Sequence, residues 1–209
     1  PMAMQFVITG TSVLVNQAVL NLFGSAASKI HMLSEQVAVS FGTAMATYAG
    51  QNYGAGKAGR VQEGLRKCAL ACEAITLGIM VIMTAFGGVM SSWFIDGYHP
   101  EVIQQAHLYL FISALFYPAL TMLFLYRNTL LGLGNGVTPM LAGVCELLSR
   151  MIGAPVLGHF FGFTGLCWIN PIAWVTASGL LFLSYRKTMR NIRPVDPTVD
   201  ASDPNKIMN

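Results

Sequence analysis

The chain has 209 residues, of which 54% are hydrophobic and only 10% are charged, and its net charge at pH 7 is +3. Soluble domains carry about 25% charged residues, so this composition excludes an ordinary water-soluble protein and favours an integral membrane protein. The net charge is too small to indicate a nucleic-acid partner. At roughly 20 residues per membrane span, the length leaves room for about six spans and their loops.

We therefore expect an all-α, polytopic membrane protein built as one bundle of transmembrane helices over residues 1–193. The expected spans run from about 4–23, 28–53, 65–95, 102–126, 138–161 and 163–185. Residues 194–209 are rich in Pro, Asp, Ser and Asn, a composition that buries too little apolar surface to order itself. This segment is predicted to be a disordered tail.

The four cysteines do not indicate a metal site or a disulfide framework. They are scattered over apolar runs, and the sequence has no Cys-x-x-Cys pair and no Cys/His cluster. Packing in the interior is the simpler explanation for such residues. We expect no metal, no cofactor and no enzymatic activity.

The first expected span carries two adjacent polar amides, Asn16 and Gln17. Amides at membrane depth are costly unless they face protein or water. They are candidates for lining a substrate cavity, and hydrogen bonding between helices without a substrate role explains them equally well.

Glu35 and Gln36 lie two turns inside the second expected span. An ionisable residue at that depth is a candidate for a functional site. The alternative is a position near the membrane interface, where Glu35 would pair with Lys29 or be hydrated.

The glycine-rich, basic stretch 50–67 follows the second span. Gly54, Gly56 and Gly59 match the pattern of a dinucleotide-binding loop, but that loop requires a preceding short strand. Here a helix-length apolar run precedes it, so we predict a turn between membrane helices, where glycines allow positive φ.

The third and fourth spans carry weaker signals. Glu73 is expected to pair with Arg66 or Lys67. Pro118 is expected to kink the fourth span, because proline removes a backbone hydrogen bond. Tyr117, just before it, is a candidate aromatic wall for a flat organic cation, although aromatic residues are common in membrane helices.

Glu146 and Arg150 in the fifth span are four residues apart and so share one helix face. Both lie near the middle of an apolar run, where either charge alone would be costly. We predict that they pair inside the bundle, either as a permanent clamp or as a gate that opens during transport. Pro155 is expected to end or kink this span.

Basic residues predict the orientation of the bundle. In the six-span layout ten of them fall on one side: Lys57, Arg60, Arg66, Lys67, Arg127, Arg186, Lys187, Arg190, Arg193 and Lys206. Because such residues prefer the cytoplasmic side, both termini are expected in the cytoplasm. The histidines fall toward the outer side and are expected to be scattered loop residues: His31, His99, His107 and His159.

Two segments carry a resemblance to a known family. The sequence GQNYGAGKAGRVQEG at 50–64 resembles the signature after the eighth helix of multidrug and toxic compound extrusion (MATE) antiporters. Residues 127–140, followed by 146–150, are similar to that family's junction between the tenth and eleventh helices. Both segments occur in the family's order and at about its spacing. The resemblance covers residues 2–193 and only the second half of a twelve-helix transporter.

The resemblance implies a fold and a function. The fold is a six-helix bundle corresponding to one lobe of the transporter, and the partner is a missing N-terminal six-helix lobe. The implied function is an antiporter of the cell membrane that exports organic cations or drugs in exchange for Na⁺ or H⁺. The cytoplasmic signature loop comprises Gln51, Asn52, Gly54, Gly56 and Arg60.

The resemblance also shapes the predicted pathway. Many family members carry acidic residues on the seventh and tenth helices, and the corresponding spans here have none. We therefore expect ion coupling to use Glu35 or the missing lobe. The expected pathway residues are Asn16, Gln17, Glu35, Gln36 and Tyr117. Because the sequence begins with Pro1, we expect a fragment of a longer protein.

Two other functions stay open. One is a flippase for lipid-linked sugars on a similar fold, which needs a basic cavity for pyrophosphate. The other is a six-helix membrane subunit that does not transport. The sequence shows only Arg150 as a basic residue at membrane depth, which favours a cation exporter over a flippase.

Overall fold

The computed structural model describes residues 25–92 and 100–192. Within these ranges all regular structure is helical, which confirms the all-α prediction. The helices are α2 (Ser25–Gly54), α3 (Ala58–Ser92), α4 (Pro100–Leu115), α5 (Tyr117–Gly132), α6 (Val137–Cys167) and α7 (Ile169–Asn191). The expected first span at 4–23 and the tail at 194–209 lie outside the described residues.

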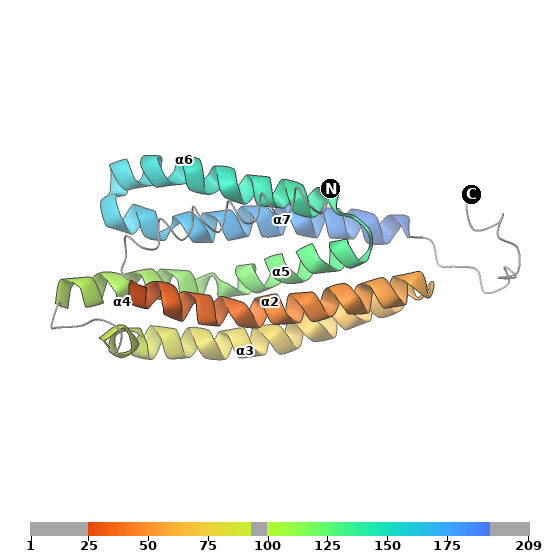
Figure 1. The fold of residues 1–209 in the computed structure, drawn as a ribbon, viewed down its shortest axis with the longest axis horizontal. Coiled ribbons are helices and arrows are strands. Elements are labelled where there is room, and N and C mark those ends of the chain that lie inside the picture. Colours follow the sequence, from red (N-terminus) through yellow and green to blue (C-terminus); the bar gives the residue numbers. More distant parts are fainter. Residues whose placement is uncertain (1–24, 93–99, 193–209) are drawn as a thin grey trace, which may run out of the picture.

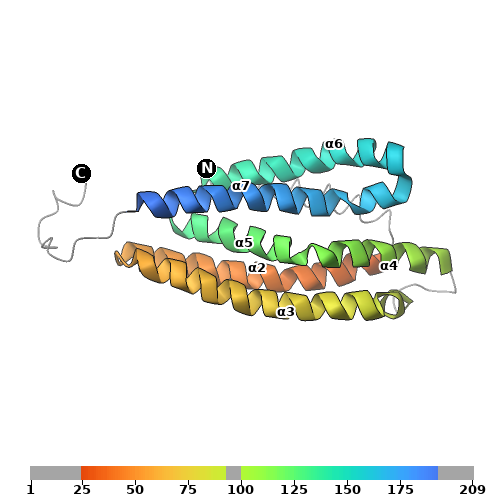
Figure 2. The ribbon, with the colours of Figure 1, turned by 180° about the vertical axis from the view of Figure 1, so that it is seen from behind.

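The helices run side by side along the long axis of the bundle (Figures 1 and 2). Packing is most extensive between α2 and α5 and between α6 and α7, and α5 also packs on α7. The α2–α3 turn, the α5–α6 connection and the end of α7 lie at one end of the bundle (Figure 1). The reversal between α6 and α7 lies at the opposite end. Helix α5 therefore joins the α2–α3 side of the bundle to the α6–α7 side.

The turn between α2 and α3 is shorter than the glycine-rich stretch predicts. Only residues 55–57 lie between the two helices, and Gly56 has a positive φ of 69°. The N–H of Gly56 donates to the carbonyl of Tyr53, and the N–H of Lys57 donates to that of Asn52. These bonds satisfy carbonyls left free at the end of α2, so a single left-handed glycine suffices to reverse the chain. Helix α3 accordingly begins at Ala58.

The fourth expected span is broken in two, as Pro118 predicts. Helices α4 and α5 meet at Phe116 and are bent by 52° relative to each other. Pro118 lies in the first turn of α5, where its missing N–H costs no helical hydrogen bond. The prediction of a proline kink in this span is confirmed.

Pro155 does not end the fifth span. Helix α6 continues through it, and the non-helical backbone lies at Gly162, with φ 57° and ψ −139°. Beyond Gly162 the chain folds back so closely that a Cβ on Gly165 would clash with the carbonyl of Leu157. The small residues, and not the proline, determine where this helix reverses into α7.

Replacing Gly162 with alanine is expected to destabilise the protein. Its backbone conformation is one that only glycine adopts at low cost, whereas a Cβ there would meet nothing within 4 Å. The cost is therefore backbone strain alone, about 1–3 kcal/mol, or roughly 2–10 °C in the melting temperature of the detergent-solubilised protein.

Gly179→Ala is the matched control, because Gly179 is helical and equally open. Alanine there should leave the melting temperature unchanged or raise it slightly. Equal effects of the two substitutions would show that the reversal at Gly162 is not strained.

The outward-facing surface of the bundle is apolar. Within 25–92 and 100–192, two helices are long and apolar enough to cross a membrane, α3 over Ala58–Phe86 and α6 over Val137–Cys167, and the bent α4–α5 pair would make a third span. Large exposed apolar side chains on α3, α6 and α7 include Leu70, Val81, Ile82, Phe86, Met151, Ile152, Phe160, Phe161 and Leu183. In water such a surface would aggregate, whereas lipid accepts it.

The core contains large aromatic side chains close to the α4–α5 break. Trp174, Tyr109 and Tyr117 are the largest fully buried side chains, and they come from α7, α4 and α5. Tyrosine and tryptophan bring a hydroxyl or N–H that needs a partner when buried. They therefore mark the place where polar groups enter the interior.

Candidate functional site

A buried group of charges links α5 and α6. The Glu146 carboxylate accepts a bond from Arg127 and lies 3.4 Å from the guanidinium of Arg150. All three residues are buried, with at most 7% of their surface exposed. The sequence predicts the Glu146–Arg150 pair, and the structure brings the two together. We call the three residues the charge triad.

Arg127 corrects one expectation. The sequence predicts a cytoplasmic turn at this residue, after the fourth span, but α5 continues to Gly132. Arg127 is therefore more than one helical turn inside α5, where Glu146 neutralises it. The signal that would have found it is the apolar sequence around it, Leu123 to Leu131, which reads as helix on both sides.

Hydrogen bonds connect the charge triad to α7 and α4. The Nε of Arg150 donates to Oδ1 of Asn170 at 3.2 Å, and Nδ2 of Asn170 donates to the hydroxyl of Tyr109 at 3.3 Å. Asn170 is itself buried. Because a buried guanidinium needs several acceptors, the Asn170 amide gives Arg150 an acceptor in addition to the Glu146 carboxylate.

His31 on α2 lies inside a box of aromatic rings. Its ring stacks on Trp174 at a centroid distance of 5.5 Å and on Tyr117 at 5.8 Å, and meets Tyr109 edge-on at 6.0 Å. Its Nδ1 lies 3.1 Å from the hydroxyl of Tyr117, and only 1% of the residue is exposed. The expectation that His31 is a loop residue is wrong, because it lies within α2 and is enclosed by α4, α5 and α7.

Glu35 lies one turn further along α2. Its Oε2 is 4.0 Å from Nε2 of His31, and 32% of its side chain is exposed. The charges of the whole triad act on this carboxylate, with that of Arg150 strongest. Glu35 is thus a partly exposed carboxylate beside the buried imidazole of His31. The side chain of Lys29, its expected alternative partner, lies outside the described residues.

The other expected pathway residues are spread more widely. Tyr117 is buried against His31 as described, in the core and not on an open wall. The side chain of Gln36 is exposed next to Glu35, and its carbonyl accepts a bond from Ser40. Asn16 and Gln17 lie outside the described residues.

The signature residues do not form a loop. Gln51, Asn52 and Gly54 lie in the last turns of α2, Gly56 is in the turn, and Arg60 is in the first turn of α3. The hydroxyl of Tyr48 donates to the carbonyl of Arg60, and Nδ2 of Asn52 donates to that of Tyr48. The first bond ties the end of α2 to the start of α3, and the second lies within the last turns of α2. The motif therefore stabilises a tight helix–helix junction.

Glu73 has a different environment from the expected one. Its Oε1 is buried and has no hydrogen-bond partner among the described residues. Lys67, one of the two expected partners, lies 2.6 Å from Glu63 instead. The predicted pairing of Glu73 with the basic residues near it is wrong, because they lie nearly two turns earlier on the exposed end of α3.

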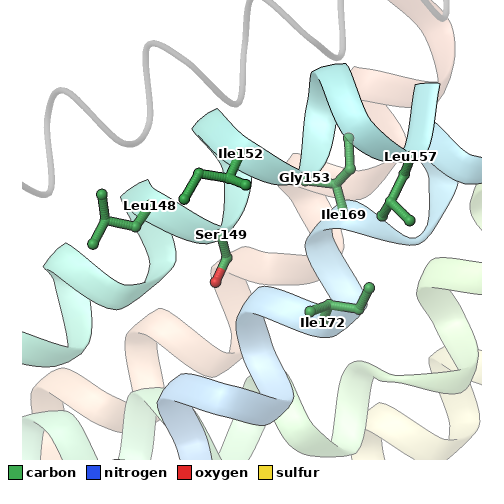
Figure 3. Close-up of a pocket in the computed structure, with 7 residues that line it drawn as sticks. All are labelled: Leu148, Ser149, Ile152, Gly153, Leu157, Ile169 and Ile172. Carbon is green, nitrogen blue, oxygen red and sulfur yellow. The ribbon is translucent and has the colours of Figure 1, made fainter. Parts of the chain in front are cut away.

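A separate apolar hollow of about 320 Å³ lies between α6 and α7 (Figure 3). The seven residues that line it are Leu148, Ser149, Ile152, Gly153, Leu157, Ile169 and Ile172. The Ser149 hydroxyl is the only polar side-chain group among these seven. None of these seven residues is charged, so the charged groups of the triad and Glu35 are separate from this hollow.

Comparisons with known proteins agree with this architecture. The family model named MatE matches residues 23–156. Among solved structures, the chain is similar to the Vibrio cholerae MATE transporter VcmN in its bent form, with 18% sequence identity and a TM-score of 0.73. The match covers 90% of this chain and 44% of the transporter, so the chain spans less than half of that protein. The search of curated proteins found no match.

Proposed function

Because the chain belongs to the MatE family, we propose that it forms one lobe of a secondary active antiporter. This antiporter exports organic cations or drugs in exchange for Na⁺ or H⁺. It works by alternating access, in which this bundle rocks against a second six-helix lobe. The protein is a multi-pass membrane protein, and we propose the cell membrane as its location.

The arrangement of Glu35 carries this proposal. A carboxylate among membrane helices is costly, and such residues mark ion and substrate pathways. Glu35 is partly exposed, and behind it lie Arg127, Glu146 and Arg150 in the interior. An organic cation or a coupling ion that reaches Glu35 from water would therefore change the charge balance of the entire interior of the lobe.

The length of the chain supports a second lobe as the partner. A match to 44% of a complete transporter leaves space for another bundle of similar size. In repeat-built transporters the substrate site lies between the two halves, near the middle of the membrane. We propose that Glu35 and Gln36 face this interface, together with Asn16 and Gln17.

We also propose that both termini are cytoplasmic. After the correction of Arg127, the exposed basic residues of the described helices gather at one end of the bundle, at the α2–α3 turn and the end of α7 (Figure 1). They are Lys57, Arg60, Arg66, Lys67, Arg186, Lys187 and Arg190. Basic residues favour the cytoplasmic side, which supports this orientation.

Glu35→Gln in the full-length transporter tests the proposed function. The amide keeps the shape but cannot hold a cation or a proton, so ethidium efflux from cells should fall at least about tenfold, the loss that ~1.4 kcal/mol of charge attraction represents. Membrane expression should stay near wild type, because Glu35 is partly solvated. The measurement is efflux per unit of transporter in the membrane.

Glu63→Gln is the matched control, since Glu63 is an exposed carboxylate of α3 that pairs with Lys67. Its efflux should equal that of the wild type. Wild-type efflux in Glu35→Gln would remove Glu35 from the pathway. Absence of efflux in the wild-type protein itself would favour a membrane subunit that does not transport.

The charge triad argues against a flippase for lipid-linked sugars. Such a protein needs basic side chains that are free to bind pyrophosphate. Here Glu146 binds both Arg127 and Arg150, and Asn170 holds Arg150 as well. Two engaged guanidiniums offer less to an anionic substrate than free ones, whereas the exposed carboxylate of Glu35 suits a cation.

A further inference from the structure

Resting on the antiport function proposed above, we propose that the coupling ion is H⁺ and that Glu35 and His31 hold it as a pair. The proton enters from water at the exposed edge of Glu35. It then resides on Oε2 of Glu35 or on Nε2 of His31, which lie 4.0 Å apart. No other bond changes, and the same proton leaves by the same edge when an organic cation replaces it.

The aromatic rings around His31 replace part of the favourable hydration that a protonated His31 loses when it is buried. A buried imidazolium is costly because it loses its hydration. Faces of aromatic rings attract cations, and desolvated cation–π contacts are worth about 2 kcal/mol each. His31 has two such faces, from Trp174 and Tyr117, at 5.5 and 5.8 Å. A neutral histidine would gain the hydrogen bond to Tyr117 over a phenylalanine, and a protonated one would gain the attraction of the two ring faces as well.

The charges around the pair explain why a proton and a cation exclude each other. The titratable groups that face it come from several helices: Tyr109 on α4, Tyr117 and Arg127 on α5, and Glu146 and Arg150 on α6. With Glu35 ionised, the two carboxylates balance the two guanidiniums. One proton or one organic cation leaves the cluster with a single excess charge. Both together would leave two in a medium of low dielectric constant, which is unfavourable.

The surroundings of Glu35 suit a proton better than Na⁺. Hard cations take several oxygen ligands. The Glu35 carboxylate lies 4.0 Å from an imidazole, whose other nitrogen faces a tyrosine hydroxyl. The described residues contain no group of three or more Asp, Glu, His or Cys side chains that would hold a metal ion. Imidazole and carboxylate together are a proton-exchanging pair.

Proton release on cation binding is the direct test. Purified full-length transporter in weakly buffered detergent solution is mixed with tetraphenylphosphonium, a cation without titratable protons, and a pH dye follows the solution. The wild type should release about one proton per bound cation near neutral pH, as linkage requires for mutually exclusive ligands. Release of no proton at any pH between 5 and 9, with the cation bound, would overturn the proposal.

His31→Phe separates the role of the imidazole from packing, because phenylalanine keeps a ring in the box. We expect cation affinity within about threefold of the wild type, less than half the proton release, and at least about tenfold slower efflux driven by a pH gradient. His159→Phe is the matched control, because His159 is exposed on α6 beside Phe160, and it should behave as the wild type. Wild-type proton release and efflux in His31→Phe would overturn the proposal.

If His31→Phe does not fold, Tyr117→Phe takes its place. It removes the hydroxyl 3.1 Å from Nδ1 but keeps the stacked ring. The pH midpoint of proton release should then shift by at least about half a unit. An unchanged midpoint would show that His31 does not take part in proton binding.

Vesicle assays distinguish failure of this proposal from failure of the proposed function. Wild-type transporter in liposomes should accumulate ethidium when a pH gradient is imposed, and a Na⁺ gradient alone should not drive uptake. Uptake that follows the Na⁺ gradient would contradict the His31 proposal and leave the antiport function standing. Absence of uptake with either gradient would contradict the antiport function itself.

Discussion

Glu146→Gln is expected to cost about 3–5 kcal/mol of folding free energy and to remove most of the folded protein from the membrane. The carboxylate of Glu146 binds both Arg127 and Arg150. Glutamine has nearly the same shape, so the loss comes from charge and not from a cavity. Two buried guanidiniums would then lie close together without the carboxylate that binds both, in a place where even one charge is costly.

The triad predicts an asymmetry that a simple pair does not. Arg150→Ala leaves the neutral pair of Arg127 and Glu146, and Arg127→Ala leaves that of Arg150 and Glu146. Each should therefore cost less than Glu146→Gln, by about 1–2 kcal/mol or more. Combining Glu146→Gln with Arg127→Gln should recover part of the loss, since a single guanidinium then remains with Asn170 as an acceptor.

The measurement is the amount and the melting temperature of detergent-solubilised, monodisperse protein. Glu63→Gln is the control, because its pair with Lys67 is exposed and worth little. Equal destabilisation by all three single substitutions would show that the charges act as independent pairs. Normal stability of Glu146→Gln would show that the triad is solvated, and would favour a gate over a clamp.

The helical architecture follows from composition and from local breaks in the sequence. An apolar chain with few charges must satisfy its backbone within helices, so the all-α fold could be predicted. Pro118 correctly marked the break between α4 and α5. Pro155 does not end the fifth span, because α6 continues through it to the non-helical backbone at Gly162. The reversal at Gly162 depends instead on a backbone conformation that no residue pattern reported.

The site was only partly predictable, because its contacts are long-range. Glu146 and Arg150 are one turn apart, so helical spacing alone pairs them. His31 and Tyr117 are separated by 86 residues, and no local pattern connects them. Arg127 was assigned to a loop because basic residues usually flank spans. Its burial depends on Glu146, 19 residues away on the next helix.

The environment of Glu35 could be predicted from the sequence only in part. Its position inside an apolar span indicated a functional role from the sequence alone. The sequence did not reveal that His31, one turn before it, connects it to an aromatic box. Helical spacing puts the two residues on one face, but the position of His31 toward the outer side, together with the other histidines, predicted a loop residue. His31 belongs to the candidate site because it is buried and lies next to Glu35.

Added side-chain volume at the contact between α2 and α5 should destabilise the protein, as loss of a charge does in the triad. A Cβ on Gly132 would clash with the carbonyl of Ala46 and lie 2.9 Å from the Cβ of Ala49 and 3.0 Å from the nitrogen of Gly50. Two of these three atoms belong to the backbone and cannot turn away. Gly132→Ala is therefore expected to push the helices apart and cost about 1–3 kcal/mol, although alanine favours a helix.

The functional loss from Gly132→Ala should exceed its effect on stability. Helix α2 carries His31 and Glu35, whereas α5 carries Tyr117 and Arg127, so a change in their packing displaces one half of the site from the other. Because charge interactions inside the bundle depend steeply on distance, ethidium efflux should fall at least about tenfold in protein that still inserts. Gly179→Ala, in open space on α7, should leave melting temperature and efflux unchanged. Normal efflux in Gly132→Ala would show that α2 and α5 separate without cost, and that their contact does not position the site.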